Sequence, residues 1–333
     1  MGSITKGARQ AVENCLKIKA GEKVVIITDR ETFKIGFAIR RAVERITNRI
    51  RFLVMEDFGG RPLDFPDEVG EALKEADVSF YVAQSAKGEY QTFRKPMLEI
   101  INANKKLRHG HMICITKQIM KDGMCSDYQE IQRVSKLVYQ KIHKAKEIRV
   151  VTEKGTDIIA HFSPRLKWVI CDGNITSGNW SNLPDGEVFT SPIDINGTVV
   201  INGCLGDFFG EKYGSLERTP VTINIKDGRA IQGSIKCENK ELERELAEYI
   251  FQTDENSSRV GEFALGTNIG LKKLIGNLLQ DEKFPGVHIA FGSPLPDHTG
   301  ADWDSNAHVD GVIKDTTVYA DGKVIMKKGK YLF

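Results

Sequence analysis

Four short apolar runs in the first third of the chain constrain the fold more than any other feature of this sequence. They occupy residues 23–28, 50–55, 78–83 and 111–116. Each is rich in β-branched and other apolar residues, and a segment long enough for a helix separates it from the next. Strands that alternate with helices in this way form βα units, whose strands lie parallel in one sheet. The first part of the chain is therefore predicted to be a Rossmann-like α/β domain.

The connection after the first run decides what this domain can bind. It reads Thr-Asp-Arg-Glu-Thr at residues 28–32, so the glycine-rich turns of dinucleotide and P-loop sites are both missing. A Rossmann-like shape therefore does not predict NAD here. Ser126 and Gln129 have the spacing of a capping box, which predicts that a last helix begins at Ser126. His109 and His111 flank the fourth strand and are expected at its edge.

A change of pattern divides the chain into two predicted domains, 1–147 and 148–333. In the second, short alternating strands are joined by glycine turns such as Lys-Asp-Gly at 226–228, which is typical of a β-hairpin. Helical patterns near 240–252 and 270–280 interrupt these strands. The predicted fold class is α/β, with an N-terminal Rossmann-like parallel-sheet domain and a C-terminal α+β domain.

Charge balance and the lack of long apolar segments narrow the range of partners. The 333 residues include 47 Lys and Arg against 45 Asp and Glu, for a formal net charge of +2. Such a chain has no field that attracts nucleic acid or an anionic membrane, so neither is an expected partner. No apolar signal segment or membrane span is present, so a cytoplasmic protein is expected. The cysteines include no CxxC pair, which argues against a disulfide framework or a zinc ribbon.

Metal-capable side chains lie in strand-like patterns near the C-terminus. Three segments carry them: residues 261–268, 287–292 and 306–310. His308 and Asp310 are two residues apart, so a strand turns both toward one face. His288 shares its face with Ala290 and Gly292, whose small size leaves room beside the imidazole. These features predict that the C-terminal domain is a metal-binding domain.

Two glutamates extend the candidate ligand set. Glu262 lies beside Phe263 and Leu265 in an otherwise uncharged run, where an unpaired buried carboxylate is costly. The three segments contain no Lys or Arg, so a metal ion is the cation that best accounts for this carboxylate. Glu187 begins a strand directly after a Pro-Asp-Gly turn, and loop-to-strand junctions often present functional carboxylates.

The order of the motifs EVFT, GEFALGTN, HIAFG and HVD resembles that of the aminopeptidase T family of metalloaminopeptidases, also known as leucyl aminopeptidase-like or thermophilic metalloprotease-like proteins. The resemblance is strongest over residues 182–333. It implies that divalent ions, namely zinc, cobalt or manganese and as many as two per chain, are bound by Glu187, Glu262, His288, His308 and Asp310. Mixed carboxylate and imidazole ligands suit these metals.

The resemblance also implies an activity. Members of this family are hydrolases, so the chain is expected to remove N-terminal residues from peptides with a metal-activated water. Either Glu187 or Glu262 would be the catalytic general base that takes the proton of this water. A peptide or small-molecule substrate and a homodimer are the partners that the resemblance implies.

Two alternatives fit parts of the same residue set. The fold is also similar to that of a dihydroxypyridine ring-cleaving dioxygenase, and His288, His308 and Asp310 supply the two histidines and one carboxylate of a non-haem iron(II) site. Glu187 and Glu262 would be surplus in such a site. The second alternative is a metal-binding relative with weakened catalysis.

The segment between the two histidines departs from the family pattern. The resemblance implies a tyrosine a few residues after the His288 strand, whereas Ser-Pro-Leu occupies residues 293–295. Asp302 and Asp304 offer alternative donors in this segment. His298 is expected to be a loop residue rather than a ligand. Trp303 is the one tryptophan close to the candidate ligands.

Overall fold

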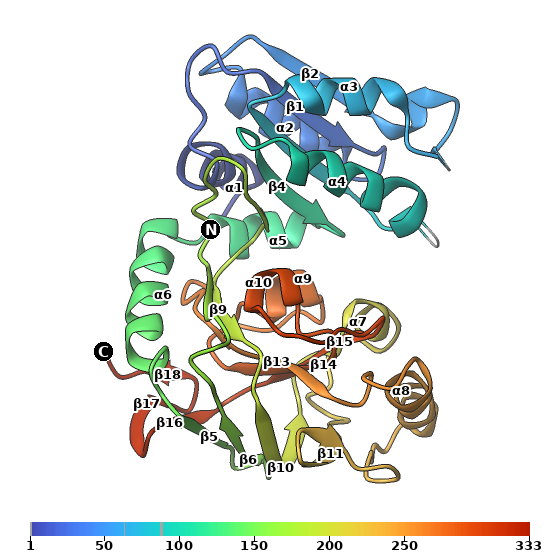
Figure 1. Cartoon of the computed structure of the whole chain (residues 1–333). Helices are drawn as coiled ribbons and strands as arrows, with labels where there is room; N and C mark the ends of the chain where they lie inside the picture. Colours follow the sequence, from blue (N-terminus) through green and yellow to red (C-terminus); the bar gives the residue numbers. More distant parts are fainter. Residues whose placement is uncertain (1, 63, 87–88) are drawn as a thin grey trace. The chain divides into compact units, whose positions relative to one another are not determined.

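The chain forms two compact units. The computed structural model describes residues 2–62, 64–86 and 89–333 (Figure 1). The units consist of Met1–Gln132 with Gly173–Asp185, and of Arg133–Asp172 with Gly186–Phe333. The sequence placed a single boundary between residues 147 and 148. The chain returns to the first unit after residue 172 because residues 180–182 add a strand to the sheet of that unit.

A parallel sheet of five strands forms the centre of the first unit, as the alternating pattern predicted. Its order is β2-β1-β3-β4-β8. The strands are β1 (Val24–Thr28), β2 (Ile50–Val54), β3 (Val78–Ala83), β4 (Arg108–Ile113) and β8 (Trp180–Asn182). Every residue of β1 and β3 is buried, so both faces of the sheet are covered.

Helices precede β1 and alternate with the strands of this unit (Figure 1). They are α1 (Ile4–Arg9), α2 (Phe33–Val43), α3 (Asp67–Glu75), α4 (Lys95–Ala103) and α5 (Lys117–Lys121), with short turns of other helical pitch at η1 (Gln10–Cys15), η2 (Met55–Phe58), η3 (Tyr90–Arg94) and η4 (Gly123–Cys125). The predicted last helix is α6 (Tyr128–Ile142). It begins after Ser126 because the Asp127 carboxylate accepts the N–H groups of Gln129 and Glu130. None of the helices in the described ranges is long and apolar enough to cross a bilayer.

The environment of two histidines in β4 differs from the prediction. The strand ends before Cys114, which adopts a left-handed φ of 53°. The expectation that His109 and His111 lie at a strand edge is wrong, because both are buried within β4, between β3 and β8. Ser79 Oγ lies 2.8 Å from His109 Nδ1, and His109 Nε2 lies 3.2 Å from His111 Nδ1. Burial lowers the pKa of His109 to about 3 and so keeps it neutral.

The second unit contains two antiparallel sheets. The first has the order β12-β11-β10-β6-β5-β16-β17-β18 and consists of β5 (Glu147–Val151), β6 (Asp157–His161), β10 (Asp194–Ile201), β11 (Val221–Lys226), β12 (Arg229–Ala230), β16 (Thr317–Ala320), β17 (Lys323–Lys327) and β18 (Lys330–Tyr331). The second has the order β15-β14-β13-β9-β7 and consists of β7 (Val169–Cys171), β9 (Glu187–Thr190), β13 (Val260–Gly266), β14 (Val287–Gly292) and β15 (His308–Ile313). The predicted turn at 226–228 joins β11 to β12.

The helices of this unit are α7 (Asp207–Tyr213), α8 (Lys240–Gln252), α9 (Leu278–Asp281) and α10 (Pro296–Thr299). The first of the two predicted helices is confirmed as α8. The second is shortened to α9, because Gly276 adopts a φ of 76° and the Asn277 side chain caps a new helix start.

One hydrophobic core lies between the two sheets and includes residues of α6 and α8. The sheet β15-β14-β13-β9-β7 contributes Val188, Phe263, Ile289 and Val309 to this core. Because neighbouring side chains in a strand point to opposite faces, the residues next to these four point to the other face of the sheet.

Candidate metal centre

The sheet face opposite the core brings predicted ligands from three strands together. On the central strand β14, Ala290 pairs with Glu262 of β13 on one side and with Asp310 of β15 on the other. Two residues along the same strand, Gly292 pairs with His308. These two small residues leave the space above the sheet to the flanking carboxylates and imidazole.

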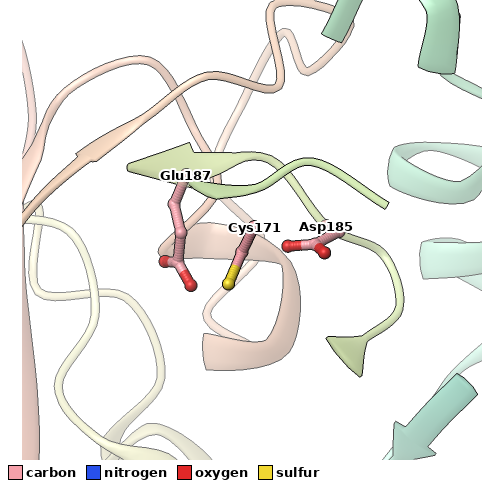
Figure 2. A group of neighbouring side chains, drawn as sticks. All are labelled: Cys171, Asp185 and Glu187. Carbon is pink, nitrogen blue, oxygen red and sulfur yellow. The ribbon is translucent and has the colours of Figure 1, made fainter. Parts of the chain in front are cut away.

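His288 and Glu187 complete the set of five predicted residues on this face. His288 lies on β14, and Glu187 begins β9. Glu187 follows Gly186, whose φ of 135° favours glycine. Figure 2 shows the side chains of Glu187 and of Cys171 on the paired strand β7, together with Asp185 at the preceding turn. A turn that depends on glycine thus presents Glu187.

Glu262 lies between two groups of donor atoms. Its Oε1 is 3.5 Å from His288 Nε2, and its Oε2 is 3.6 Å from His308 Nε2. Glu187 Oε2 lies 3.4 Å from His288 Nε2, and Asp310 Oδ2 lies 3.4 Å from His308 Nε2. Within each group the three donor atoms lie within 4.8 Å of one another. The five residues therefore form two three-donor groups that share one carboxylate.

The donor chemistry fits divalent cations. The imidazole-to-carboxylate distances exceed the usual N–H···O separation of about 2.7–3.2 Å, and these side chains converge on shared points. Three of the residues are buried carboxylates, Glu187, Glu262 and Asp310. A buried carboxylate is stable only where a cation or hydrogen-bond donors compensate its charge. Mixed imidazole and carboxylate donors suit zinc, cobalt or manganese, and a carboxylate between two donor groups is compatible with a two-ion site.

The centre is accessible on the side of His308. Its side chain is 31% exposed, whereas that of His288 is 2% exposed. His308 Nδ1 lies 3.1 Å from the Ser293 carbonyl oxygen, and its backbone N–H donates to Tyr249 Oη. A ring whose Nδ1–H donates to a carbonyl keeps Nε2 as an acceptor, which is the form that binds a metal.

Lys283 and Glu282 also belong to the centre, although the sequence analysis did not select them. Lys283 Nζ lies 2.6 Å from Glu187 Oε1 and 2.7 Å from Glu282 Oε1, and its side chain is 2% exposed. Glu282 forms a further donor group with His288 and Asp310. Lys283 lies outside the three strand segments, in the turn before β14. The signal that could have found it is the Asp-Glu-Lys triplet just before the His288 strand.

The other donors between the two histidines lie apart from these groups. His298 is exposed on α10, and Asp302 and Asp304 are exposed in the loop that follows. None of the three belongs to a donor group in the part of the chain that the structure describes. Leu295, one of the residues found where the family resemblance implied a tyrosine, precedes α10 with a left-handed φ of 53°.

Carboxylates raise the pKa values of both histidines in the metal-free protein. Burial alone would lower the pKa of His288, but Glu262 and Glu187 outweigh it and raise this pKa to about 9. Burial would likewise lower the pKa of His308, but Asp310 and Glu262 raise it to about 10. Protonated histidines therefore stabilise the metal-free fold below the unfolded pKa of about 6.5, and this contribution is lost as pH rises through about 9–10.

Metal affinity is consequently expected to depend on pH. A bound ion needs the unprotonated nitrogen of each imidazole, so binding displaces protons. Between pH 8 and 6 we expect the dissociation constant for zinc to rise about tenfold for each unit by which the pH falls, for each proton that binding displaces. Titration against a competing chelator at several pH values measures this. A His298→Ala variant should show the same dependence, and an affinity that does not change with pH would contradict the assigned donors.

The fold and the paired donor groups define a candidate metalloenzyme of the α/β class. The sequence profile of the thermophilic metalloprotease (M29) family matches residues 99–331, and the chain belongs to this family, as the motif order predicted. No curated protein gives a significant match to the chain.

Two solved structures share the fold over nearly the whole chain. Wild-type AmpT from Thermus thermophilus has 18% sequence identity and a TM-score of 0.71, with 99% of each chain covered. The 2,5-dihydroxypyridine dioxygenase from Pseudomonas putida KT2440 has 15% identity and a TM-score of 0.70, with 99% of this chain and 96% of that chain covered. At these identities the similarity shows the fold alone, and it confirms the predicted α/β class with a second domain.

Proposed function

We propose that the chain is a metal-dependent aminopeptidase that removes N-terminal residues from short peptides. The main support is the position of Glu262, which directs one oxygen toward each donor group. Divalent ions held by these groups would supply Lewis acidity to a scissile carbonyl and lower the pKa of a water. Membership of a metalloprotease family supports the same class of reaction.

The five candidate ligands would have different roles in the proposed site. Glu187 and His288 would hold one ion, and His308 and Asp310 would hold the other. Glu262 faces both groups and would take the proton from a water held between them. We favour it over Glu187 as the general base because Glu187 Oε1 already accepts a hydrogen bond from the Lys283 ammonium, so that oxygen is not available to take a proton.

The ring-cleaving dioxygenase alternative gains no support from the donor groups. An iron site of that kind needs two histidines and one carboxylate around one point. Over the described residues, His288 and His308 fall in different groups, each with two carboxylates. The solved dioxygenase is 15% identical to this chain, so its similarity concerns the fold.

The metal content of the protein tests the proposal. Protein purified without chelator and loaded with zinc, cobalt or manganese is expected to hold two ions per chain, because the five candidate ligands form two donor groups that share Glu262. His308→Ala removes a donor from one group only and should reduce the content to about one ion with little loss of fold. Elemental analysis measures both, and release of leucine from leucyl peptides should require the added ion.

His298→Ala is the matched control, since this exposed histidine belongs to neither group. It should retain two ions and full activity. A protein that holds two ions and cleaves no leucyl peptide would contradict the aminopeptidase. One iron per chain, together with oxygen uptake on a dihydroxypyridine, would establish the alternative.

A further inference from the structure

Arg259 and Trp303 form a stacked pair beside the candidate metal centre. The Arg259 guanidinium carbon lies 4.1 Å from the centroid of the Trp303 ring. Arg259 directly precedes β13, and its carbonyl accepts the N–H of Gly292 at 2.8 Å. Gly292 in turn pairs with His308, the most exposed of the five candidate ligands. The stacked pair therefore lies at the accessible edge of the centre.

Strand geometry turns Arg259 toward the same face as the ligands. Val260 pairs with Phe291 within the core, and the register shifts at Gly261 before Glu262. Because neighbouring residues alternate, Arg259 points opposite to Val260 and shares the face of Glu262. The three-residue step along the strand from Arg259 to Glu262 spans at most about 10 Å. That distance equals about two to three residues of an extended peptide.

The charge of Arg259 is only partly balanced within the part of the chain that the structure describes. Within the described ranges no carboxylate forms an ion pair with its guanidinium, and Asp302 acts only through longer-range attraction. Burial and the nearby Arg229 lower the pKa of Arg259 below its ordinary value, as expected for a partly desolvated cation. Arg229 differs, because its guanidinium donates to the Glu255 carbonyl and to Asn256 Oδ1.

We propose that Arg259, stacked on Trp303, binds the C-terminal carboxylate of the substrate, so that the preferred substrates are dipeptides and tripeptides with a free C-terminus. This inference rests on the proposed aminopeptidase function. Stacking leaves the N–H groups at the guanidinium edge free, and they match a carboxylate in a bidentate arrangement. The short distance from Glu262 suits the terminus of a short chain.

Leucyl-glycyl-glycine and its C-terminal amide test this subsite on the metal-loaded protein. Wild-type kcat/KM should favour the free acid by about tenfold or more, the usual effect of a charge-assisted hydrogen bond. Arg259→Gln should raise KM for the free acid by a similar factor, leave kcat nearly unchanged and leave the amide unaffected. Arg244→Gln, at an exposed position of α8, is the matched control and should keep the preference. If Arg259→Gln fails to fold, Arg259→Lys should give an intermediate preference, since it keeps the charge without the planar fork.

Each outcome separates this subsite from the proposed function. Equal kcat/KM for both peptides in the wild type would overturn the subsite and leave the aminopeptidase intact. An Arg259-dependent preference for an amidated peptide with an acidic side chain would also overturn it. If protein with two ions cleaves neither peptide, the proposed function fails. The affinities of the two peptides, measured by calorimetry, then test the subsite by itself. Equal affinities overturn it, and tighter, Arg259-dependent binding of the free acid supports it.

Discussion

Glu262→Gln is expected to weaken metal binding at both donor groups and, at saturating metal, to lower kcat by about 10²–10⁴-fold. Glu262 belongs to both groups, with one oxygen near His288 and the other near His308. Glutamine keeps the size of the side chain but loses the negative charge. An amide can neither offset two cations nor act as a general base. Elemental analysis and turnover of a leucyl peptide measure the two losses.

The stability of the same variant separates a functional from a purely structural carboxylate. In the metal-free protein, Gln also removes a charge partner of the two protonated histidines, so the fold should survive with a lower melting temperature. Glu217→Gln is a suitable control, because this exposed residue pairs only with Lys314 and should keep its metal and activity. A Glu262→Gln protein that melts higher, binds metal as before and keeps its activity would remove Glu262 from the centre.

The face occupied by the candidate ligands could be predicted because side-chain direction in a strand is a local property. His308 and Asp310 share a face in any strand, and the small residues Ala290 and Gly292 already indicated space beside His288. The parallel sheet was predictable for a similar reason, since the alternation of strands and helices is visible along the chain.

Contacts between distant segments were beyond this kind of prediction. Lys283 contacts Glu187, which lies 96 positions earlier in the sequence. The periodicity of apolar residues within a segment does not indicate which distant turn will place a cation beside a strand. Strand β8 joins the first unit through pairing with β4, far earlier in the chain. Its few residues have no strand pattern of their own. The sequence therefore predicted one domain boundary, whereas the chain passes between the two units more than once.

Lys283→Met is expected to destabilise the metal-free protein by about 3–5 kcal/mol, because it leaves the buried Glu187 and the partly buried Glu282 without their ammonium partner. Lys283 Nζ contacts both Glu187 and Glu282, and its side chain is 2% exposed. Bound ions would supply positive charge next to Glu187, so the loss should be smaller in the metal-loaded protein. Urea unfolding with chelator and with saturating zinc measures both values.

A double variant and a surface control decide whether the effect comes from charge. Adding Glu282→Gln to Lys283→Met removes one of the stranded carboxylates and should recover part of the lost stability. Lys314→Met breaks a more exposed pair with Glu217, for which a change of about 0–1 kcal/mol is expected with or without zinc. If Lys283→Met lowers stability equally with and without zinc, and Glu282→Gln restores none of it, the lysine is a packing residue. It would then have no part in balancing the charge of the candidate metal centre.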